Sequence, residues 1–517
     1  MLTIRARIHA RCLIPGLLLL WWMMPAETLL VGQEPPGFGP PTESTFEPVE
    51  LPAQSALESP IESLLEPIPA GEALPIDPSE RATSECLDLL ESDGSTVDGP
   101  YEEFVDGEYV DGEYIEGEGV YSDCDAAEYC GESFCGPTSQ YWMRFDYLLW
   151  WTNGTRLPAL VTTSPADQPP GVLGDADTRV LFGNTTVNRE GRSNFRATLG
   201  YWIDCAHQIG FEGDYFDLGT EEARYSDMSI GDRVLTRPFF DTEQAGAPAV
   251  QRIAYPLGVV AGLGEVGCVN VRARDHFTST GAALRYNLRY HSDACEMDAG
   301  CGPAACFDVD RVRSFRLDLT TGYRYYRLGD SLRINEQIVS IAGSPSPIAV
   351  GTAFELSDRF RADNEFNGGE IGLIAQIHRG RWSFEFLAKM AVGGNRQTLT
   401  INGQTDITVP GNPTVTHAGG LLAMPSNSGT FTGSNLVVIP QFGAEVGFRV
   451  SDRLRAYVGY NLLLWAHVGR AADQIDMDLN LSQASSGTLV GAADPAFVYR
   501  DSNFWAQGLN VGAEFCF

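Results

Sequence analysis

Apolar and polar residues alternate with a period of two in ten separate stretches of this chain. The last stretch is the plainest, with Trp505, Leu509, Val511, Phe515 and Phe517 on one face and mainly small or polar residues on the other. A period of two places these sets on opposite faces of a β-strand. An apolar face with aromatic residues at both ends is typical of a strand that crosses an outer membrane. A strand of a soluble β-sandwich is the alternative.

The other nine stretches repeat this alternation and carry charged residues on their second face. We expect strands at Tyr141–Trp151, Phe195–Ile203, Ile209–Tyr215, Leu284–Tyr290, Phe315–Tyr325, Ile371–Ile377, Trp382–Met390, Leu436–Val450 and Leu454–Leu464. Charges on strands covered in aromatic residues need water or each other, so the charged face should line a barrel interior. Ser331–Ile341 and Thr398–Val409 are candidates for further hairpins. The pattern predicts an all-β, antiparallel outer-membrane barrel of about 10–12 strands.

The connections between these stretches alternate in length. Asp204–His207, His378–Arg381 and Ser451–Arg453 are short turns, and the fourth connection at that end is the cysteine-rich segment Ser292–Asp310. The connections at the opposite end are all long. Outer-membrane barrels have short periplasmic turns and long outer loops. We therefore expect both ends of the barrel sequence, Tyr141 and Phe517, at the periplasmic rim.

The sequence before the barrel differs in composition and charge. Arg5, Arg7 and Arg11 precede the apolar run Leu13–Met24, which has the layout of a secretory signal, so we assign residues 1–32 to a signal peptide. Residues 33–140 form an acidic Pro- and Gly-rich arm, which we expect to be disordered and periplasmic, and residues 141–517 form the barrel.

The charge of the arm limits its partners. Between Glu27 and Gln140 there are 28 acidic residues and one basic residue, a net charge of −27. The arm is expected to be a solvated spacer; binding of divalent cations or of a basic cell-wall partner is the alternative. The net charge of the whole chain, −33, argues against nucleic-acid binding.

The charged residues on the inner face are the candidate lumen lining: Arg144, Asp146, Arg196, Glu212, Asp214, Arg285, Arg289, Arg316, Asp318, Arg324, Glu370, Glu385, Lys389, Glu445, Arg449 and Arg455. A porin would use such residues to select solutes. They can equally neutralise one another in a filled interior. A barrel of about 10–12 strands favours a narrow or plugged lumen, because open channels appear near 16 strands.

Two cysteine triplets share the spacing C-x5-C-x4-C, and both fall at the predicted periplasmic rim, near Cys516. They are Cys124, Cys130 and Cys135, and Cys295, Cys301 and Cys306. An exported protein meets an oxidising compartment, so these six are disulfide candidates. A six-thiolate metal site is the alternative, but it lacks the C-x2-C spacing.

The sequence predicts no catalytic residues, no metal site and no cofactor. Neither G-x-S-x-G nor H-E-x-x-H occurs, and the seven histidines are scattered. The run GLGEVG at 262–267 formally matches G-x-G-x-x-G, but it sits in a long loop with no helix after it. We therefore expect a protein that is not an enzyme.

Four stretches carry a resemblance to a known family. YWMRFDYLLWWTNG, LPALVTTSP, DRFRADNEFNGGEIGL and AVGGNRQTL are similar to the planctomycete family called putative beta-barrel porin 7. The resemblance covers residues 135–517 and leaves the acidic arm outside. It implies a barrel fold and a location in the cell envelope, without adding functional residues.

These observations predict an outer-membrane protein of the porin type, with a narrow or plugged lumen and passive passage of small solutes at most. Its expected partner is outer-membrane lipid. The alternative is a structural envelope protein that tethers the outer membrane to cell-wall proteins through the periplasmic cysteines and the acidic arm.

Overall fold

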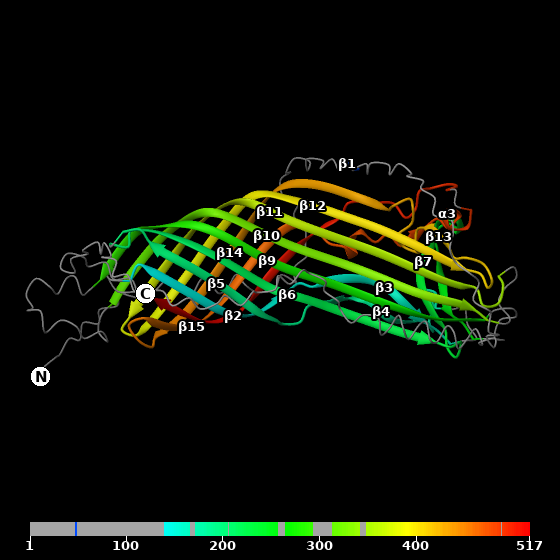
Figure 1. The fold of residues 1–517 in the computed structure, drawn as a ribbon, viewed down its shortest axis with the longest axis horizontal. Coiled ribbons are helices and arrows are strands. Elements are labelled where there is room, and N and C mark those ends of the chain that lie inside the picture. The colour runs from blue at the N-terminus through cyan, green and yellow to red at the C-terminus, as the bar shows by residue number, and fades with distance from the viewer. Residues whose placement is uncertain are drawn as a thin grey trace, which may run out of the picture. The chain divides into compact units, whose positions relative to one another are not determined.

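A computed structural model describes the barrel and the segments that enter it. The described residues are 47–48, 139–165, 171–204, 206–256, 264–292, 313–341, 348–486 and 489–517. The predicted signal peptide, the rest of the acidic arm and the two cysteine triplets lie outside them. Most of the described chain is β-strand (Figure 1).

Ten antiparallel strands close into a barrel, which confirms the predicted fold class. They are β2 (Tyr141–Thr152), β5 (Arg192–Trp202), β6 (Ile209–Ser229), β9 (Glu265–Ser292), β10 (Arg313–Ser340), β11 (Ala353–Arg379), β12 (Trp382–Thr408), β14 (Gly429–Arg449), β15 (Leu454–Gly469) and β17 (Asp501–Cys516). The terminal strand β17 pairs with β2, and β12 pairs with β14, so the ring has no open edge.

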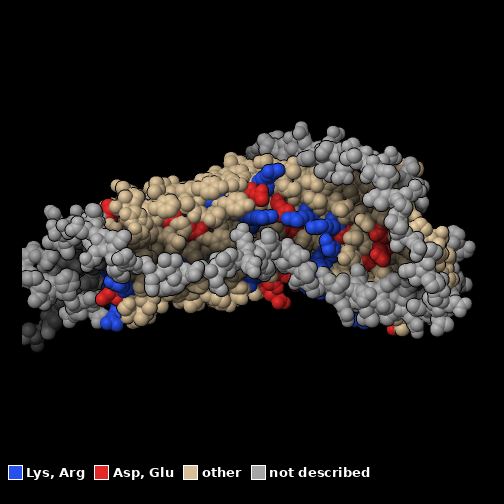
Figure 2. Space-filling view, viewed as in Figure 1, with Lys and Arg blue, Asp and Glu red and all other residues tan. Residues whose placement is uncertain are grey.

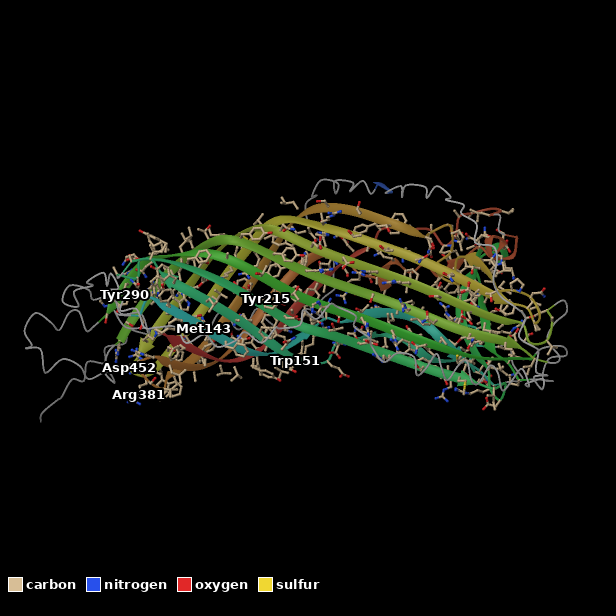
Figure 3. All side chains as sticks on the ribbon, viewed as in Figure 1. Met143, Trp151, Tyr215, Tyr290, Arg381 and Asp452 are labelled. Carbon is tan, nitrogen blue, oxygen red and sulfur yellow. The ribbon has the colours of Figure 1, made fainter. Side chains whose placement is uncertain are left out.

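An apolar band surrounds the part of the barrel near the short turns. Large apolar side chains point outward at alternate positions and are exposed; among them are Tyr141, Met143, Phe145, Tyr147, Leu199, Phe211, Tyr215, Leu284, Tyr286, Tyr323, Ile371, Leu373, Phe386, Phe442, Val458, Tyr460, Leu509, Val511 and Phe515. Met143 and Tyr215 mark this band in Figure 3. Such a band, about 25 Å tall, is what faces lipid in an outer-membrane barrel.

The short connections lie at one end of the barrel, as predicted. They are residues 203–208, 380–381 and 450–453, and Arg381 and Asp452 mark this end in Figure 3. We call it the short-turn end. The chain enters β2 and leaves β17 there, where Tyr141 and Phe517 exchange two backbone hydrogen bonds of 3.0 Å.

Four strands run far beyond the apolar band toward the opposite end, and we call these parts of the strands the outer extension. β9 and β10 have 28 residues each and β11 and β12 have 27 each, whereas a membrane-crossing strand needs about 9–11. The segments Ser331–Ile341 and Thr398–Val409, predicted as candidate hairpins, are continuations of β10 and β12. The closed ring therefore has ten strands and no added hairpin from these two segments.

A second sheet packs against the inner face of these extensions. It comprises β3 (Thr155–Thr163), β4 (Arg179–Val187), β7 (Leu235–Asp241), β8 (Ala247–Ala254) and β16 (Asp478–Leu479). Leu157, Val161 and Phe239 of this sheet form one buried cluster with residues such as Ile334 and Phe360 of the long strands. Only long loops were predicted for these segments. The strands of the second sheet share a buried core with the barrel wall. Their positions in the sequence do not predict this contact.

Smaller elements complete the described chain. β1 (Glu47–Pro48) pairs with β14, and β13 (Val415–Ala418) pairs with the end of β12. The helical segments are η2 (Thr242–Gln244), η3 (Ala472–Gln474) and α3 (Ser482–Ser486). Within the described residues, no helix is long and apolar enough to cross a membrane.

One glycine near the short-turn end makes room for a buried indole ring. A Cβ atom added at Gly200 would lie 1.9 Å from the ring of Trp142, which is 3% exposed and packs on Trp202. We expect Gly200→Ala to lower the free energy of unfolding by about 1–3 kcal/mol, because a crowded core must shift its side chains or backbone. Guanidinium unfolding of the refolded barrel measures this loss.

The matched control is Gly394→Ala in β12, where an added Cβ meets nothing within 4 Å. Equal losses in the two variants would contradict the packing argument.

Candidate functional site in the barrel interior

A layer of charged side chains fills the barrel interior at the level of the apolar band. Fourteen of the sixteen predicted lumen residues lie in it: Arg144, Asp146, Arg196, Glu212, Asp214, Arg285, Arg316, Asp318, Arg324, Glu370, Glu385, Lys389, Glu445 and Arg455. Glu514 of β17 joins them. The charged layer thus holds seven basic and eight acidic side chains.

Arg324 of β10 joins two carboxylates, Asp214 of β6, which is two strands away, and Glu370 of the adjacent strand β11. Its guanidinium group lies 2.5 Å from Asp214 and 2.8 Å from Glu370, and its side chain is 3% exposed. Lys389 approaches Glu370 at 3.3 Å and Glu212 at 3.4 Å. Four strands, β6, β10, β11 and β12, are therefore connected through ion pairs inside the barrel.

Asp318 is the centre of a second group nearer the short-turn end. It accepts hydrogen bonds from Arg285 at 2.5 Å, from Arg316 at 2.8 Å and from Asn287 at 2.8 Å. Arg316 also lies over the ring of Trp202, 4.4 Å from its centroid. The fully buried carboxylate thus has donors on several sides, which a buried charge requires.

A third group lies on the side of the barrel formed by the first and last strands. Arg144 lies 3.0 Å from Glu385 and also contacts Glu445. Arg196 donates to Asp146 at 3.0 Å, and Arg455 lies 2.7 Å from Glu514. The three groups surround a cavity of about 70 Å³, which has room for a few water molecules.

An aromatic layer lies next to the charged layer on its outer side. Seven rings, each at most 2% exposed, pack across the interior: Trp150, Phe216, Phe277, Tyr326, Phe366, Trp465 and Phe504. Phe277 is in contact with several of the others; its centroid is 5.0 Å from Phe504 and 5.4 Å from Phe216. Trp150 donates through Nε1 to Asn510 at 3.0 Å, so its polar atom has a partner.

Two predicted lumen residues are not in the charged layer. The β9–β10 register shifts between Leu317 and Asp318, so that Asn287 pairs with Asp318 and Arg289 pairs with Leu317. This irregularity turns Arg289 to the exposed outer surface, and its placement in the lumen was wrong. Arg449 is the last residue of β14 and lies half-buried at the short-turn end.

Sequence reasoning missed some interior residues that the same alternation could have found. Glu514 shares the inner face of β17 with Asn510, which is fully buried. Trp150 and Tyr326 are also on inner faces, but aromatic residues there look like a continuation of the apolar band. Among the described residues, no group of three or more His, Cys, Asp or Glu side chains could hold a metal ion.

Buried ion pairs continue beyond the aromatic layer, within the outer extension. Arg192 lies 2.6 Å from Asp275, and Arg470 lies 2.6 Å from Asp330. In the core between the two sheets, Arg237 of β7 lies 3.0 Å from Glu336 and 2.7 Å from Asp358. The pairs of Arg237 and Arg470 attach the inner sheet and one connection to the wall, and the pair of Arg192 with Asp275 joins two strands of the wall.

Glu336 gives the outer extension a pH dependence. Burial raises the pKa of Glu336 from its ordinary value of 4.5 to about 7, against the opposing effect of Arg237. Such a group keeps its proton in the folded protein after the unfolded chain has released it. The free energy of unfolding should therefore fall as the pH rises from about 4.5 to about 7. We expect Glu336→Gln to reduce this fall, as measured by guanidinium midpoints across that range.

Asp330, whose pKa burial raises to about 6, should leave part of the slope in the Glu336→Gln variant. Glu190→Gln, at an exposed position, is the matched control and should keep the full slope. The same slope in Glu336→Gln and in the unmodified chain would contradict the assignment.

A closed antiparallel barrel with an apolar outer band and ion pairs inside is an outer-membrane β-barrel of the porin type. The chain belongs to the family described as "Putative beta barrel porin-7", whose sequence model matches residues 142–517. This confirms the family resemblance. No curated protein sequence matches the chain at a significant level.

Several solved structures are similar to this chain at low sequence identity. The outer membrane protease OmpT from Escherichia coli is 9% identical, with 74% of this chain and 98% of that chain covered and a TM-score of 0.29. A Pseudomonas aeruginosa FadL homologue is 8% identical, with 73% and 90% covered and a TM-score of 0.20. The P. putida toluene transporter TodX is 8% identical, with 73% and 89% covered and a TM-score of 0.18.

Proposed function

We propose that this protein is a closed outer-membrane barrel that allows passive passage of small solutes at most and catalyses no reaction. The observation that carries this proposal is the aromatic layer, whose seven rings are each at most 2% exposed. The charged layer supports it as well, because its seven basic and eight acidic side chains pair with one another. In the proposed orientation, the short-turn end faces the periplasm and the long strands extend outward from the cell.

Swelling of proteoliposomes tests this proposal. Vesicles that contain the refolded barrel are diluted into iso-osmotic solutions of a pentose or a disaccharide. We expect the disaccharide and the pentose to cause no more swelling than in protein-free vesicles. Swelling with the pentose at the rate of a general-diffusion porin of known pore size would overturn the proposal.

A second candidate is a tether between the outer membrane and the cell wall. Cys516 at the short-turn end is disulfide-bonded, as expected in an oxidising compartment. The described start of β2, the end of β9 and the start of β10 are at this same end. The acidic arm and the two cysteine triplets, which lie outside the described residues, connect to these strand ends in the sequence. We propose that cell envelopes run on a non-reducing gel would show a reducible complex of high mass. Migration only as the single chain under those conditions would count against the tether.

A further inference from the structure

Arginines gather on the outer surface of the extension, just beyond the apolar band. Eight of them point outward: Arg224, Arg272, Arg274, Arg327, Arg333, Arg359, Arg361 and Arg396. We call this set the arginine belt. On the face shown in Figure 2, few charges lie over the apolar band, and Lys and Arg side chains gather beside it.

Four of these arginines stand directly opposite one another on adjacent strands. Arg224 of β6 pairs in register with Arg272 of β9, Arg272 with Arg333 of β10, and Arg333 with Arg359 of β11. Like charges in directly opposed positions destabilise a sheet. The row therefore has an unfavourable arrangement that an anion bound across it would relieve.

The carboxylates on this surface leave part of the belt without a partner. Glu222 contacts Arg224 and Arg274, and Asp363 lies 2.6 Å from Arg361 and 3.4 Å from Arg327. With Glu365 and Asp217, four acidic side chains face eight guanidinium groups. Arg333, Arg359 and Arg396 form no ion pair with any residue that the structure describes, and all three are exposed.

The electrostatics of the row agree with this excess of positive charge. The pKa of Arg359 is lowered by burial and then by the charges of Arg333 and Arg361. The pKa of Arg272 is lowered by burial, by Arg274 and by Arg333. The charge of Arg333 thus makes both of its neighbours in the row, Arg272 and Arg359, less favourable as cations.

The distance of the arginine belt from the apolar band limits which class of anion can bind to it. Along β10, Arg327 lies two residues beyond the outward-facing Tyr325, and Arg333 lies eight residues beyond it. At about 3.3 Å per residue these are about 7 Å and about 26 Å along a tilted strand. The headgroup layer of a bilayer leaflet is about 5–8 Å thick. The belt therefore begins at the headgroups and continues beyond them.

We propose that the arginine belt binds the phosphate groups of a phosphorylated glycolipid in the outer leaflet. Guanidinium groups bind phosphate with two parallel hydrogen bonds, and they suit this role better than ammonium groups. A glycolipid fits because its sugars carry phosphates beyond the acyl boundary, whereas an ordinary phospholipid places its phosphate at one level only. The site rests on the proposed outward orientation of the long strands, but not on the closed lumen.

The test is a titration of the purified full-length chain in a neutral detergent, followed by native mass spectrometry. The probes are a rough-type lipopolysaccharide with phosphates on its lipid A and on its core sugars, and the same glycolipid with all phosphates removed. The variant is Arg333→Gln with Arg359→Gln, which removes two unpaired charges. The matched control is Arg289→Gln with Arg453→Gln, two exposed arginines at the short-turn end.

We expect the phosphorylated lipid to bind at least about 10-fold more tightly than the dephosphorylated lipid, since each arginine near an anionic lipid contributes about 1 kcal/mol. The belt variant lacks two arginines and should lose about 30-fold in affinity for the phosphorylated lipid, while the control variant keeps its affinity. Heat-modifiable gel migration should show both variants folded.

Equal binding of the two lipids, or equal weakening in both variants, would overturn the proposal. Inorganic phosphate at millimolar concentration should not displace the lipid; full displacement would assign the belt to free phosphate and overturn the lipid. Cross-linking can also show whether the acidic arm occupies the belt in the full chain. An arm that occupies the belt and blocks lipid binding would overturn the proposal. None of these experiments measures conductance. The lipid-binding proposal can therefore be contradicted while the proposed closed lumen stands, and the reverse is also true.

Discussion

Replacing Arg324 with leucine is expected to lower the free energy of unfolding by about 3–5 kcal/mol, because removing one partner of a buried ion pair leaves the other charge uncompensated. Arg324 is 3% exposed and lies 2.5 Å from Asp214 and 2.8 Å from Glu370. Without it, Lys389 is the remaining cation near Glu370, at 3.3 Å. Guanidinium unfolding from phospholipid vesicles measures the loss.

The control for this prediction is Arg289→Leu. Arg289 lies on the neighbouring strand β9 and is exposed on the outer surface. It should change the free energy of unfolding by about 0.5 kcal/mol or less, as most exposed substitutions do. A loss at Arg324 no larger than the loss at Arg289 would show that the charged layer contributes little to stability.

Phe277→Ala should be comparably destabilising, with an expected loss of about 3–5 kcal/mol. Phe277 is fully buried and stands among Phe216, Phe504 and Trp465 in the aromatic layer. Removing its ring opens a cavity. The neighbouring rings can fill this cavity only in part, because the long strands hold them in place. The same unfolding experiment measures the loss, and proteoliposomes made with this variant should leak small ions faster than those made with the unmodified chain.

Phe386→Ala provides the comparison for this second prediction. Phe386 is 52% exposed on the apolar band, so its truncation leaves no internal cavity. We expect a smaller loss of stability and no change in ion leakage. If both phenylalanine variants behaved alike, the aromatic layer would not be the element that fills the interior.

The membrane-facing part of the fold could be predicted from the sequence because lipid imposes a simple rule on it. Outward residues must be apolar and inward residues are polar, so Phe386 and Glu385 already identify their faces. Beyond the membrane the rule inverts. In β10, Arg333 points outward and the fully buried Ile334 points inward. One continuous strand therefore reads as two segments, and the second was assigned to a separate hairpin.

The candidate site shows the same limits. Alternation along each strand located fourteen charged residues of the interior, but it could not find the register irregularity beside Asp318 that turns Arg289 outward. It also could not pair Arg324 with Asp214, because these residues lie two strands apart and meet across Gly281 of β9, which pairs in register with both. The arginine row across β6, β9, β10 and β11 depends on register, which the sequence does not specify.

Single-channel recording in planar lipid bilayers tests the closed interior most directly. The unmodified chain, refolded and purified, is added to one side of the membrane, and the current is followed at constant voltage in molar potassium chloride. A barrel filled by the charged and aromatic layers should insert without producing steady conductance steps. Steps of uniform size that persist across many insertions would contradict the closed barrel and would favour an open porin.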